Sequence, residues 1–170
     1  MTMPMPPPAI RAAIPEDLLL LPAVEEAADA PFAALGIGPL PPPGGVDELR
    51  AARHVLVAGR PPIGFARLEE VDGVAHLEQL SVHADHHRRG VGSALLRAAC
   101  ATAAGEGHRA ITLITYRDVP WNAPFYARHG FEPVPEEELT PGLRELRRHE
   151  GELGLDRFGA RVVMRAVLPG

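Results

Sequence analysis

The most informative segment of the chain reads Leu80-Ser-Val-His-Ala-Asp-His-His-Arg-Arg-Gly-Val-Gly-Ser-Ala-Leu-Leu96. It predicts a strand that runs through a basic, glycine-containing turn into a helix, because helical spacing of apolar residues begins at Gly90. Unpaired N–H groups at a helix N-terminus carry about half a positive charge, so this layout is typical of an anion site. Arg88 and Arg89 add positive charge, and Gly90 and Gly92 allow close approach to the backbone. The same residues also fit a tight turn with solvated arginines.

The motif and the composition exclude several classes of protein. The turn is not a P-loop, whose GxxxxGK[ST] pattern needs lysine, and it is not a GxGxxG turn. All 17 basic residues are arginine, which excludes Schiff-base and lysine-nucleophile mechanisms. A net charge of −5 gives no polycationic surface for nucleic acid, so we expect no nucleic-acid partner.

The size of the chain suits one globular domain. It has 170 residues, of which 46% are hydrophobic and 23% charged, and we expect a single domain over residues 10–170 after a loose N-terminus at 1–9. The longest apolar run, Leu18 to Leu21, is far too short to span a bilayer. The N-terminus lacks the basic and apolar parts of a secretory signal, and a single cysteine, Cys100, is compatible with a reducing compartment. We therefore expect a cytoplasmic protein without a membrane partner.

The pattern of apolar residues and turn signals predicts alternating helices and strands. Helices are expected over residues 16–34, 46–53, 90–105, 124–129 and 141–155, and strands over 54–58, 63–70, 74–83, 110–115, 131–134 and 161–168, with an additional strand at 10–13. This order predicts an α+β fold, of three layers, in which a mostly antiparallel sheet carries a helical crossover near its centre.

Two motifs resemble landmarks of the GNAT superfamily of acyl-CoA N-acyltransferases. The first, His87-Arg-Arg-Gly-Val-Gly92, is similar to the pattern Gln/Arg-x-x-Gly-x-Gly/Ala that opens a helix after an apolar strand end, here Val82. The second, Phe125-Tyr-Ala-Arg-His-Gly-Phe131, looks like the helix that carries a tyrosine and is closed by Gly-Phe. The resemblance covers residues 63–134 well and the rest only by the order of elements. His87 departs from the pattern, because glutamine or arginine is usual there.

The resemblance implies a GNAT-like mixed sheet with splayed parallel central strands and flanking helices. Acetyl-CoA would lie between the strands at 74–83 and 110–115 as a cosubstrate, without a metal. Its pantetheine would pair with the backbone of three residues: Leu80, Ser81 and Val82. Its pyrophosphate would meet the amides of six residues: Arg88, Arg89, Gly90, Val91, Gly92 and Ser93. The histidines His83, His86 and His87 lack the carboxylate scaffold of a metal site.

The resemblance also implies three catalytic residues. An alkyl ammonium has a pKa of about 10.4, so a base must remove a proton before the nitrogen attacks. A period of two puts His76, Glu78, Leu80 and Val82 on one face of the strand. Residues 75–83 are similar to a strand of arylalkylamine N-acetyltransferases in which two histidines relay the proton, which implies Glu78 as base through water and His76 as relay or co-base. Tyr126 matches the tyrosine that protonates the leaving thiolate, and its other interpretation is a core aromatic residue.

Three functions follow from these expectations. The first is an acetyl-CoA-dependent N-acetyltransferase for a primary amine, in particular that of a small molecule, because the proline-rich loop at 39–45 and the helix at 141–155 would narrow the acceptor side. The second is a protein N-terminal or lysine acetyltransferase, which the sequence does not separate from the first. The third is a catalytically silent acyl-CoA-binding sensor domain. Many family members form homodimers, and the resemblance allows one here.

Overall fold

The structure is a computed structural model, and it describes residues 6–169. One seven-stranded sheet has the strand order β1-β2-β3-β4-β5-β7-β6. The strands are β1 (Ile10–Ala12), β2 (His54–Ala58), β3 (Gly64–Val71), β4 (Val74–Val82), β5 (Ala110–Tyr116), β6 (Glu132–Pro133) and β7 (Arg161–Val167). Only β4 and β5 pair in parallel within the described residues, which confirms the predicted α+β fold with a mostly antiparallel sheet. Residues 1–5 of the expected loose N-terminus lie outside this range.

The helices follow the predicted order, with one correction near the N-terminus. They are α1 (Pro15–Leu18), α2 (Leu21–Asp29), α3 (Val46–Ala51), α4 (Val91–Gly105), α5 (Ala123–Ala127) and α6 (Pro141–Glu152), with short 3-10 turns η1 (Ala30–Leu35), η2 (Ala84–His86), η3 (Glu136–Glu138) and η4 (Leu155–Phe158). The single helix expected over 16–34 is wrong. It is divided into α1, α2 and η1, because Pro22 and Pro31 lack an N–H group and each lies in the first turn of a new segment.

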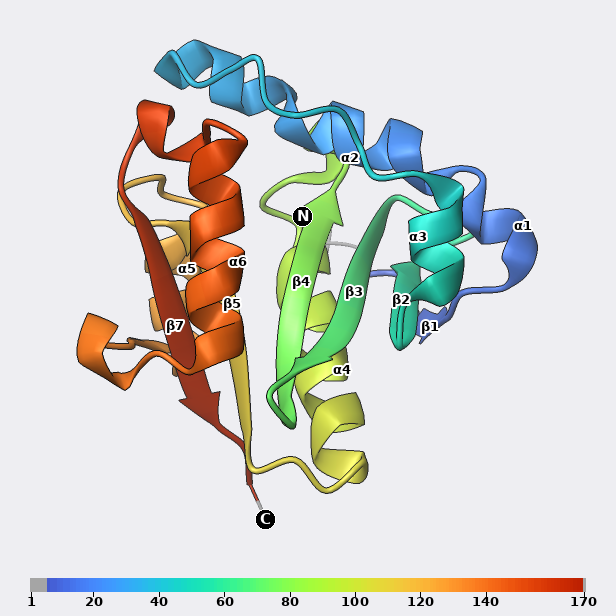
Figure 1. Ribbon diagram of the computed structural model, residues 1–170. Helices are drawn as coiled ribbons and strands as arrows, with labels where there is room; N and C mark the ends of the chain where they lie inside the picture. Colours follow the sequence, from blue (N-terminus) through green and yellow to red (C-terminus); the bar gives the residue numbers. More distant parts are fainter. Residues whose placement is uncertain (1–5, 170) are drawn as a thin grey trace.

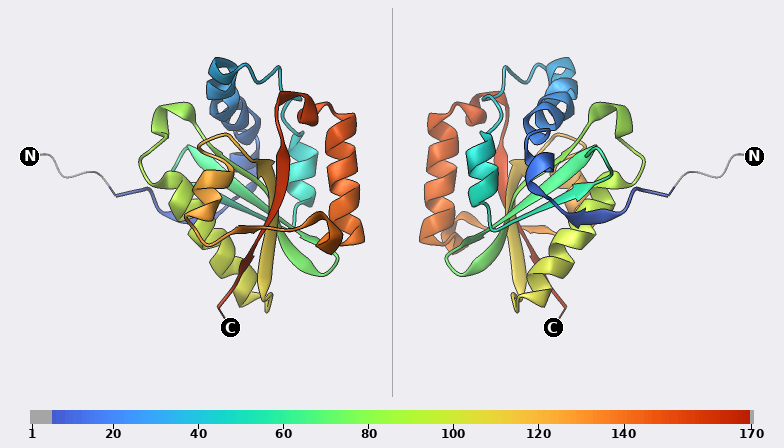
Figure 2. Two further views of the ribbon diagram at one scale, coloured as in Figure 1. Left: turned by 90° about the vertical axis from the view of Figure 1, so that its left-hand side faces the viewer. Right: turned by 90° about the vertical axis from the view of Figure 1, so that its right-hand side faces the viewer.

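The sheet is the middle of three layers (Figures 1 and 2). On the back face, α4 and α5 bury the main core, where Leu95 and Leu96 of α4 pack with Leu77 and Ile111 of the sheet. On the front face lie α2, α3 and α6, over smaller apolar clusters. Within residues 6–169, no helix combines the length and apolar composition that crossing a membrane requires.

The two parallel strands diverge along their length. β4 and β5 are in register only from Ala75–Leu77 against Ile111–Leu113, although both strands continue beyond this point. Figure 1 shows β4 and β5 separating toward the end covered by α2. The later residues of β4 therefore have an edge without a partner strand, and the backbone groups on such an edge are open to a ligand.

Candidate active site

An extra residue in β4 interrupts the alternation of its side chains. The pairing register with β3 shifts after Arg67, so that Glu78 has no opposite residue. A bulge of this kind moves the following side chains to the other face of the strand. Leu80 and Val82 consequently pack against the back core, and the expectation that they share a face with His76 and Glu78 is wrong.

His76 and Glu78 nevertheless lie next to each other. His76 is only 2% exposed, and its Nε2 lies 3.6 Å from Oε2 of Glu78. At the other edge of the ring, Nδ1 lies 2.8 Å from the Oγ1 of Thr112 on β5. His76 and Thr112 are register partners, so the imidazole joins β4 to β5 at the point where the two strands begin to separate.

Burial perturbs both titratable groups in this pair. It lowers the pKa of His76 to about 4, so the imidazole is neutral at pH 7. Burial also raises the pKa of Glu78, while Arg67 opposes the rise. Three other carboxylates add to it: Glu150, Glu69 and Glu48. Glu78 still has 38% of its side chain exposed, against 3% for His76, so Glu78 is the member of the pair with access to a ligand or water.

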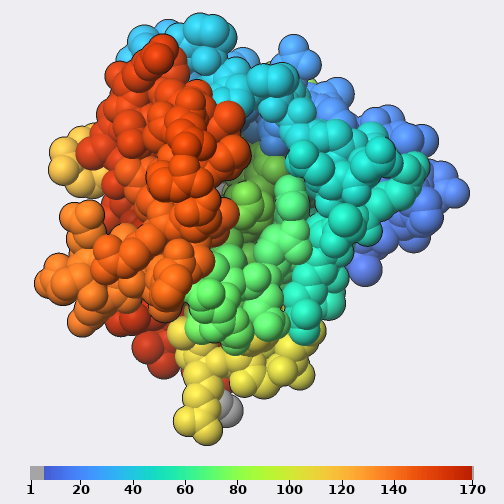
Figure 3. Space-filling model, in the orientation of Figure 1, coloured from blue at the N-terminus to red at the C-terminus, as the bar shows by residue number. Residues whose placement is uncertain are grey.

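The surface of β3 and β4 is recessed between α3 and α6 (Figure 3), and we call this surface the front recess. Glu25 of α2 and Gln79 of β4 line one part of it, and Gln79 donates a hydrogen bond to Glu25. Burial raises the pKa of Glu25 to about 7, with a further contribution from Asp29. Arg67 offsets part of the negative charge.

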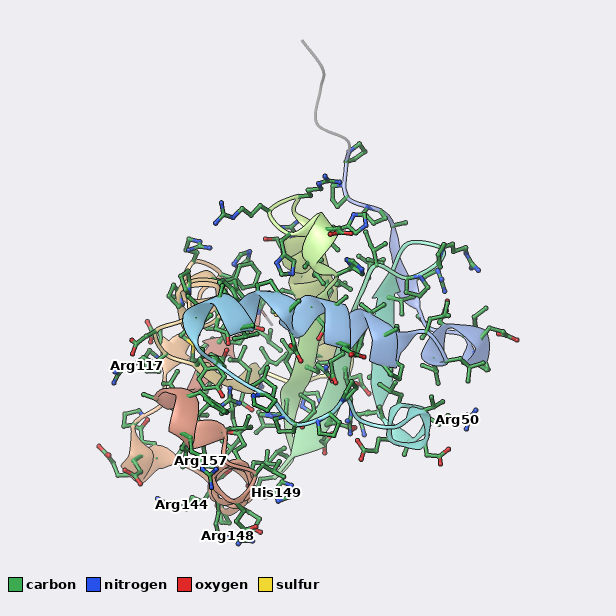
Figure 4. The ribbon with its side chains drawn as sticks, turned by 90° about the horizontal axis from the view of Figure 1, so that it is seen from above. Arg50, Arg117, Arg144, Arg148, His149 and Arg157 are labelled. Carbon is green, nitrogen blue, oxygen red and sulfur yellow. The ribbon has the colours of Figure 1, made fainter. Side chains whose placement is uncertain are left out.

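Several of the labelled cationic side chains lie at the rim of the molecule. Seen from above, Arg50 lies beside α3 and Arg144 and Arg148 lie around α6, at the rim of the molecule (Figure 4). Glu25 of α2 and Glu48 of α3 line the front recess together with Arg67 of β3. Such a surface favours a cationic ligand over an anionic one.

The turn between β4 and α4 contains two residues with a left-handed backbone. Arg88 has φ 63° and Gly90 has φ 82°, and left-handed residues are one element of the backbone concavities that bind anions. Gly90 caps α4, and Arg88 and Arg89 are exposed. The ring of His87 turns inward, where its Nε2 lies 2.6 Å from the carbonyl oxygen of Val82. His87 therefore ties the turn to the end of β4.

A contact that the sequence did not reveal joins α5 to the start of α4. His129 Nδ1 lies 2.9 Å from the carbonyl oxygen of Phe125, and Nε2 lies 3.0 Å from Oγ of Ser93. Because a carbonyl only accepts, Nδ1–H donates to Phe125 and the Ser93 hydroxyl donates to Nε2. A Cβ on Gly92 would lie 3.6 Å from the Phe125 ring, at ordinary contact distance. No periodicity or spacing in the sequence indicates this long-range contact.

Tyr126 is buried in the main core on the back face. It is 8% exposed, and its ring packs edge-on against Phe125 and Phe131. Burial raises the pKa of its phenol, so the hydroxyl is protonated at neutral pH. Of the hydrogen bonds found in residues 6–169, none involves this hydroxyl, and none links it to His76 or Glu78.

The histidines before the glycine turn do not converge on a common point. His83 and His86 have ring centroids 5.9 Å apart, while His87 is turned to the backbone. In the described part of the chain, no group of three His, Cys, Asp or Glu side chains has the arrangement of a metal site.

A family model matches the region that contains these features. The model is described as an acetyltransferase (GNAT) domain, and it matches residues 51–133. This range includes the diverging strands, the bulge at Glu78, the glycine turn and Tyr126. It does not include α2 and α6, which border the front recess.

Several solved structures are similar to the whole chain. A GCN5-related N-acetyltransferase from Rhodopseudomonas palustris has 22% identity and a TM-score of 0.66, with 99% of this chain and 100% of that chain covered. A protein from Mycobacterium tuberculosis, solved in complex with CoA, has 18% identity and a TM-score of 0.67, with 95% and 100% covered. The ribosomal-protein-S18-alanine N-acetyltransferase from Escherichia coli has 17% identity and a TM-score of 0.65, with 95% and 94% covered. At these identities the similarity establishes the fold.

Proposed function

Because the chain belongs to the GNAT superfamily, we propose that it transfers an acetyl group directly from acetyl-CoA to a primary amine. The observation that carries this proposal is the divergence of β4 from β5 after Leu77, with a left-handed glycine turn at the end of β4. Residues 10–170 would act as one domain. The similar structure from Mycobacterium tuberculosis, which was solved with CoA, supports the choice of cosubstrate.

Acetyl-CoA would lie along the free edge of β4. The pantetheine would pair with backbone groups of Leu80, Ser81 and Val82, which have no partner in β5. The carbonyl of Val82 already accepts a hydrogen bond from His87, so its N–H is the group left for the cosubstrate. The pyrophosphate would lie on the amides of the turn: Arg88, Arg89, Gly90, Val91, Gly92 and Ser93. The exposed Arg88 and Arg89 would add charge-assisted hydrogen bonds.

Glu78 would act as the general base. The acceptor arrives as an ammonium ion and has to lose a proton before its nitrogen attacks the thioester carbon. Glu78 is exposed to the front recess and has a raised pKa, which brings a carboxyl group closer to the pH at which a base works best. His76, whose pKa is lowered to about 4, would remain neutral beside it and assist Glu78 through a ring nitrogen.

Tyr126 would act as the general acid. Attack of the amine and collapse of the tetrahedral intermediate release CoA as a thiolate, which needs a proton. The Tyr126 phenol is protonated because burial raises its pKa. It lies on the back face, opposite the carboxylate that takes the proton from the amine. Because the proton donor Tyr126 and the proton acceptor Glu78 lie on different faces of the sheet, both proton transfers can occur while acetyl-CoA and the amine are bound.

The acceptor would be a small amine. The front recess is bordered by α3 and α6 (Figure 3), and α2 with the loop that follows it crosses above β4 (Figure 4). This enclosure favours a small molecule over an extended peptide. The surrounding carboxylates, Glu25 among them, would attract its positive charge. The similarity to an enzyme that acetylates a ribosomal-protein alanine makes a protein N-terminus the second candidate.

The test is a calorimetric titration with acetyl-CoA, followed in the same sample by thiol release with a panel of small amines and basic peptides. We expect binding of acetyl-CoA and thiol release with small amines. Release only with peptides would favour the protein acetyltransferase. Binding without release would favour a silent acyl-CoA sensor, and absence of binding would contradict the proposal.

A further inference from the structure

Thr112 of β5 makes two contacts that bear on which ring nitrogen of His76 carries the hydrogen. Its hydroxyl oxygen lies 2.8 Å from Nδ1 of His76 and 3.4 Å from the carbonyl oxygen of Ala75. Thr112 is only 4% exposed and His76 only 2%. Water therefore has little access to this pair, and the polar atoms have to satisfy one another.

The chemistry of these groups assigns the protons. A carbonyl oxygen only accepts, so in the contact with Ala75 the Thr112 hydroxyl is the donor. The hydroxyl has one hydrogen, and its oxygen is then an acceptor for the remaining neighbour, Nδ1 of His76. With the hydroxyl hydrogen directed to Ala75, the 2.8 Å contact with Nδ1 needs the ring hydrogen on Nδ1. In a neutral imidazole the other nitrogen, Nε2, then has a free lone pair.

We infer that Thr112 is a positioning residue: it holds neutral His76 with its hydrogen on Nδ1, so that Nε2 presents a lone pair beside the Glu78 carboxylate. Two acceptor atoms 3.6 Å apart can bind a group that has two N–H donors. The ammonium of the acceptor amine has three N–H groups. This inference rests on the proposed function, because it specifies how the amine is held at the same site.

The arrangement also distinguishes between the two roles considered for His76. A relay through the ring has to release the hydrogen on Nδ1 when Nε2 gains one. Here Nδ1–H points to Thr112, whose hydroxyl points to the amide carbonyl of Ala75, and an amide carbonyl does not take up a proton at neutral pH. The proton that leaves the ammonium goes to Glu78: R–NH3+ and a carboxylate become R–NH2 and a carboxylic acid. His76 orients the amine and does not relay its proton.

Other charged groups also act on this site. Glu78 faces the His76 ring from the same strand, and Glu69 is the register partner of His76 in β3. Glu150 of α6 raises the pKa of His76 against the effect of burial. Arg67 of β3 acts on Glu78. None of these charged groups is hydrogen-bonded to Nδ1. A substitution at residue 112 therefore removes the hydrogen bond between Nδ1 and Thr112 and leaves the charged groups in place.

The first test is NMR spectroscopy of the protein labelled with 15N at histidine. The chain has 8 histidines, and loss of one signal set in His76→Gln identifies His76. We expect Nδ1 of His76 to be protonated and Nε2 to be unprotonated at pH 7 in the wild type. Thr112→Val keeps the branched shape and removes the hydroxyl, and the hydrogen is then expected on Nε2. Thr112→Ser should restore the wild-type form.

The second test is steady-state acetylation by the same variants. Thr112→Val is expected to lower kcat on the order of tenfold, as for other groups that orient a functional side chain. The dissociation constant of acetyl-CoA should be unchanged, and Thr112→Ser should recover most of kcat. Thr102→Val is the matched control, because Thr102 also donates to a backbone carbonyl, at 2.9 Å from Ala98 O in α4, and lies away from the site. Thermal unfolding of each variant tests the fold.

The outcomes separate this inference from the proposed function. A wild-type His76 with its hydrogen on Nε2 would overturn the inference, and so would an unchanged tautomer and kcat in Thr112→Val. Both results leave acetyl transfer by the wild type intact. If no amine is acetylated by the wild type, the proposed function fails, while the spectra still support or overturn the role of Thr112 in setting the tautomer.

Discussion

His76 Nε2 and Glu78 Oε2 lie 3.6 Å apart on β4, with the bulge in the strand at Glu78 itself. In a regular strand, side chains two residues apart lie about 7 Å from each other. The two side chains together place a buried, neutral imidazole beside a partly exposed carboxylate in one small site. This combination can hold an ammonium group and take a proton from it.

Replacement of Tyr126 by phenylalanine is expected to lower kcat more than tenfold, as for loss of a general acid. Acetyl-CoA affinity should change little, because the ring still packs between Phe125 and Phe131. Tyr116→Phe is the matched control, since its hydroxyl donates to the Leu155 carbonyl and has no role in transfer. Equal kcat for the two variants, measured by thiol release, would remove Tyr126 as the acid.

A negative charge at Gly92 is expected to abolish binding of acetyl-CoA and leave the fold intact. Gly92 lies in the first turn of α4, where a carboxylate is favourable for helix stability and unfavourable for a bound pyrophosphate. Gly92→Ala adds only a Cβ, 3.6 Å from the Phe125 ring. Titration calorimetry should show binding to Gly92→Ala and no binding to Gly92→Glu. Normal binding to both would mean that the phosphates lie elsewhere.

The ionised form of Glu25 is expected to lower the stability of the folded protein at alkaline pH. Burial raises its pKa from 4.5 to about 7, so its contribution to stability is fully present below pH 4.5 and is lost as the pH rises through about 7. Glu25→Gln should therefore raise Tm relative to the wild type at pH 8, and the two should converge below pH 4.5. Glu26→Gln, at the exposed neighbouring position, is the control. A pH-independent difference would contradict the raised pKa.

The same Glu25→Gln variant is expected to bind cationic amines less well. Above its pKa of about 7, Glu25 adds negative charge to the part of the front recess that it lines with Gln79. The KM for a cationic amine should rise severalfold with kcat little affected, because Glu25 does not contact the reacting atoms. An unchanged KM would show that the charge of Glu25 does not reach the acceptor.

The ion pair of Arg11 and Asp17 is expected to stabilise the N-terminal region. Arg11 Nη1 lies 2.6 Å from Asp17 Oδ2, and this bond lowers the pKa of Asp17 from 3.8 to about 2. The stability that this ion pair contributes is present above pH 3.8 and lost as the pH falls through about 2.

Urea unfolding tests this ion pair. Asp17→Asn should be less stable than the wild type at pH 7, and the difference should shrink toward pH 2. Asp47→Asn is the control: Asp47 pairs with Arg50 at the surface, where such pairs contribute between about 0 and 1 kcal/mol. Equal effects of the two substitutions would contradict the special role of Asp17.

Regular, local patterns in the sequence were sufficient to predict much of the fold. The strand expected at 54–58 and the helix ending at Gly105 are confirmed, since each has strong periodicity and a clear end signal. The diverging parallel strands were implied by the family resemblance and are also confirmed. The helix expected over 16–34 failed because prolines inside an apolar pattern divide it into separate segments.

The orientation of the site residues depends on contacts between residues that are far apart in the sequence, and such contacts leave little pattern in the sequence. Residues 76–80 alternate as a regular strand would, so the bulge at Glu78 is visible only through the register with β3. Thr112 becomes a partner of His76 only when β5 pairs with β4. The pairing of His129 with Ser93 likewise arises from the packing of α5 on α4. The sequence indicated which residues carry chemistry, and the structure was needed to see how they are oriented.

Proton removal from the acceptor amine by Glu78 is tested most directly by kcat against pH for the wild type, Glu78→Gln and the exposed control Glu137→Gln. The wild type and the control are expected to share a rate that rises with pH through an apparent pKa above 4.5, because burial raises the pKa of Glu78. Glu78→Gln should lose about a hundredfold in kcat and this pH dependence. A Glu78→Gln profile that matches the wild type in height and shape would contradict the account.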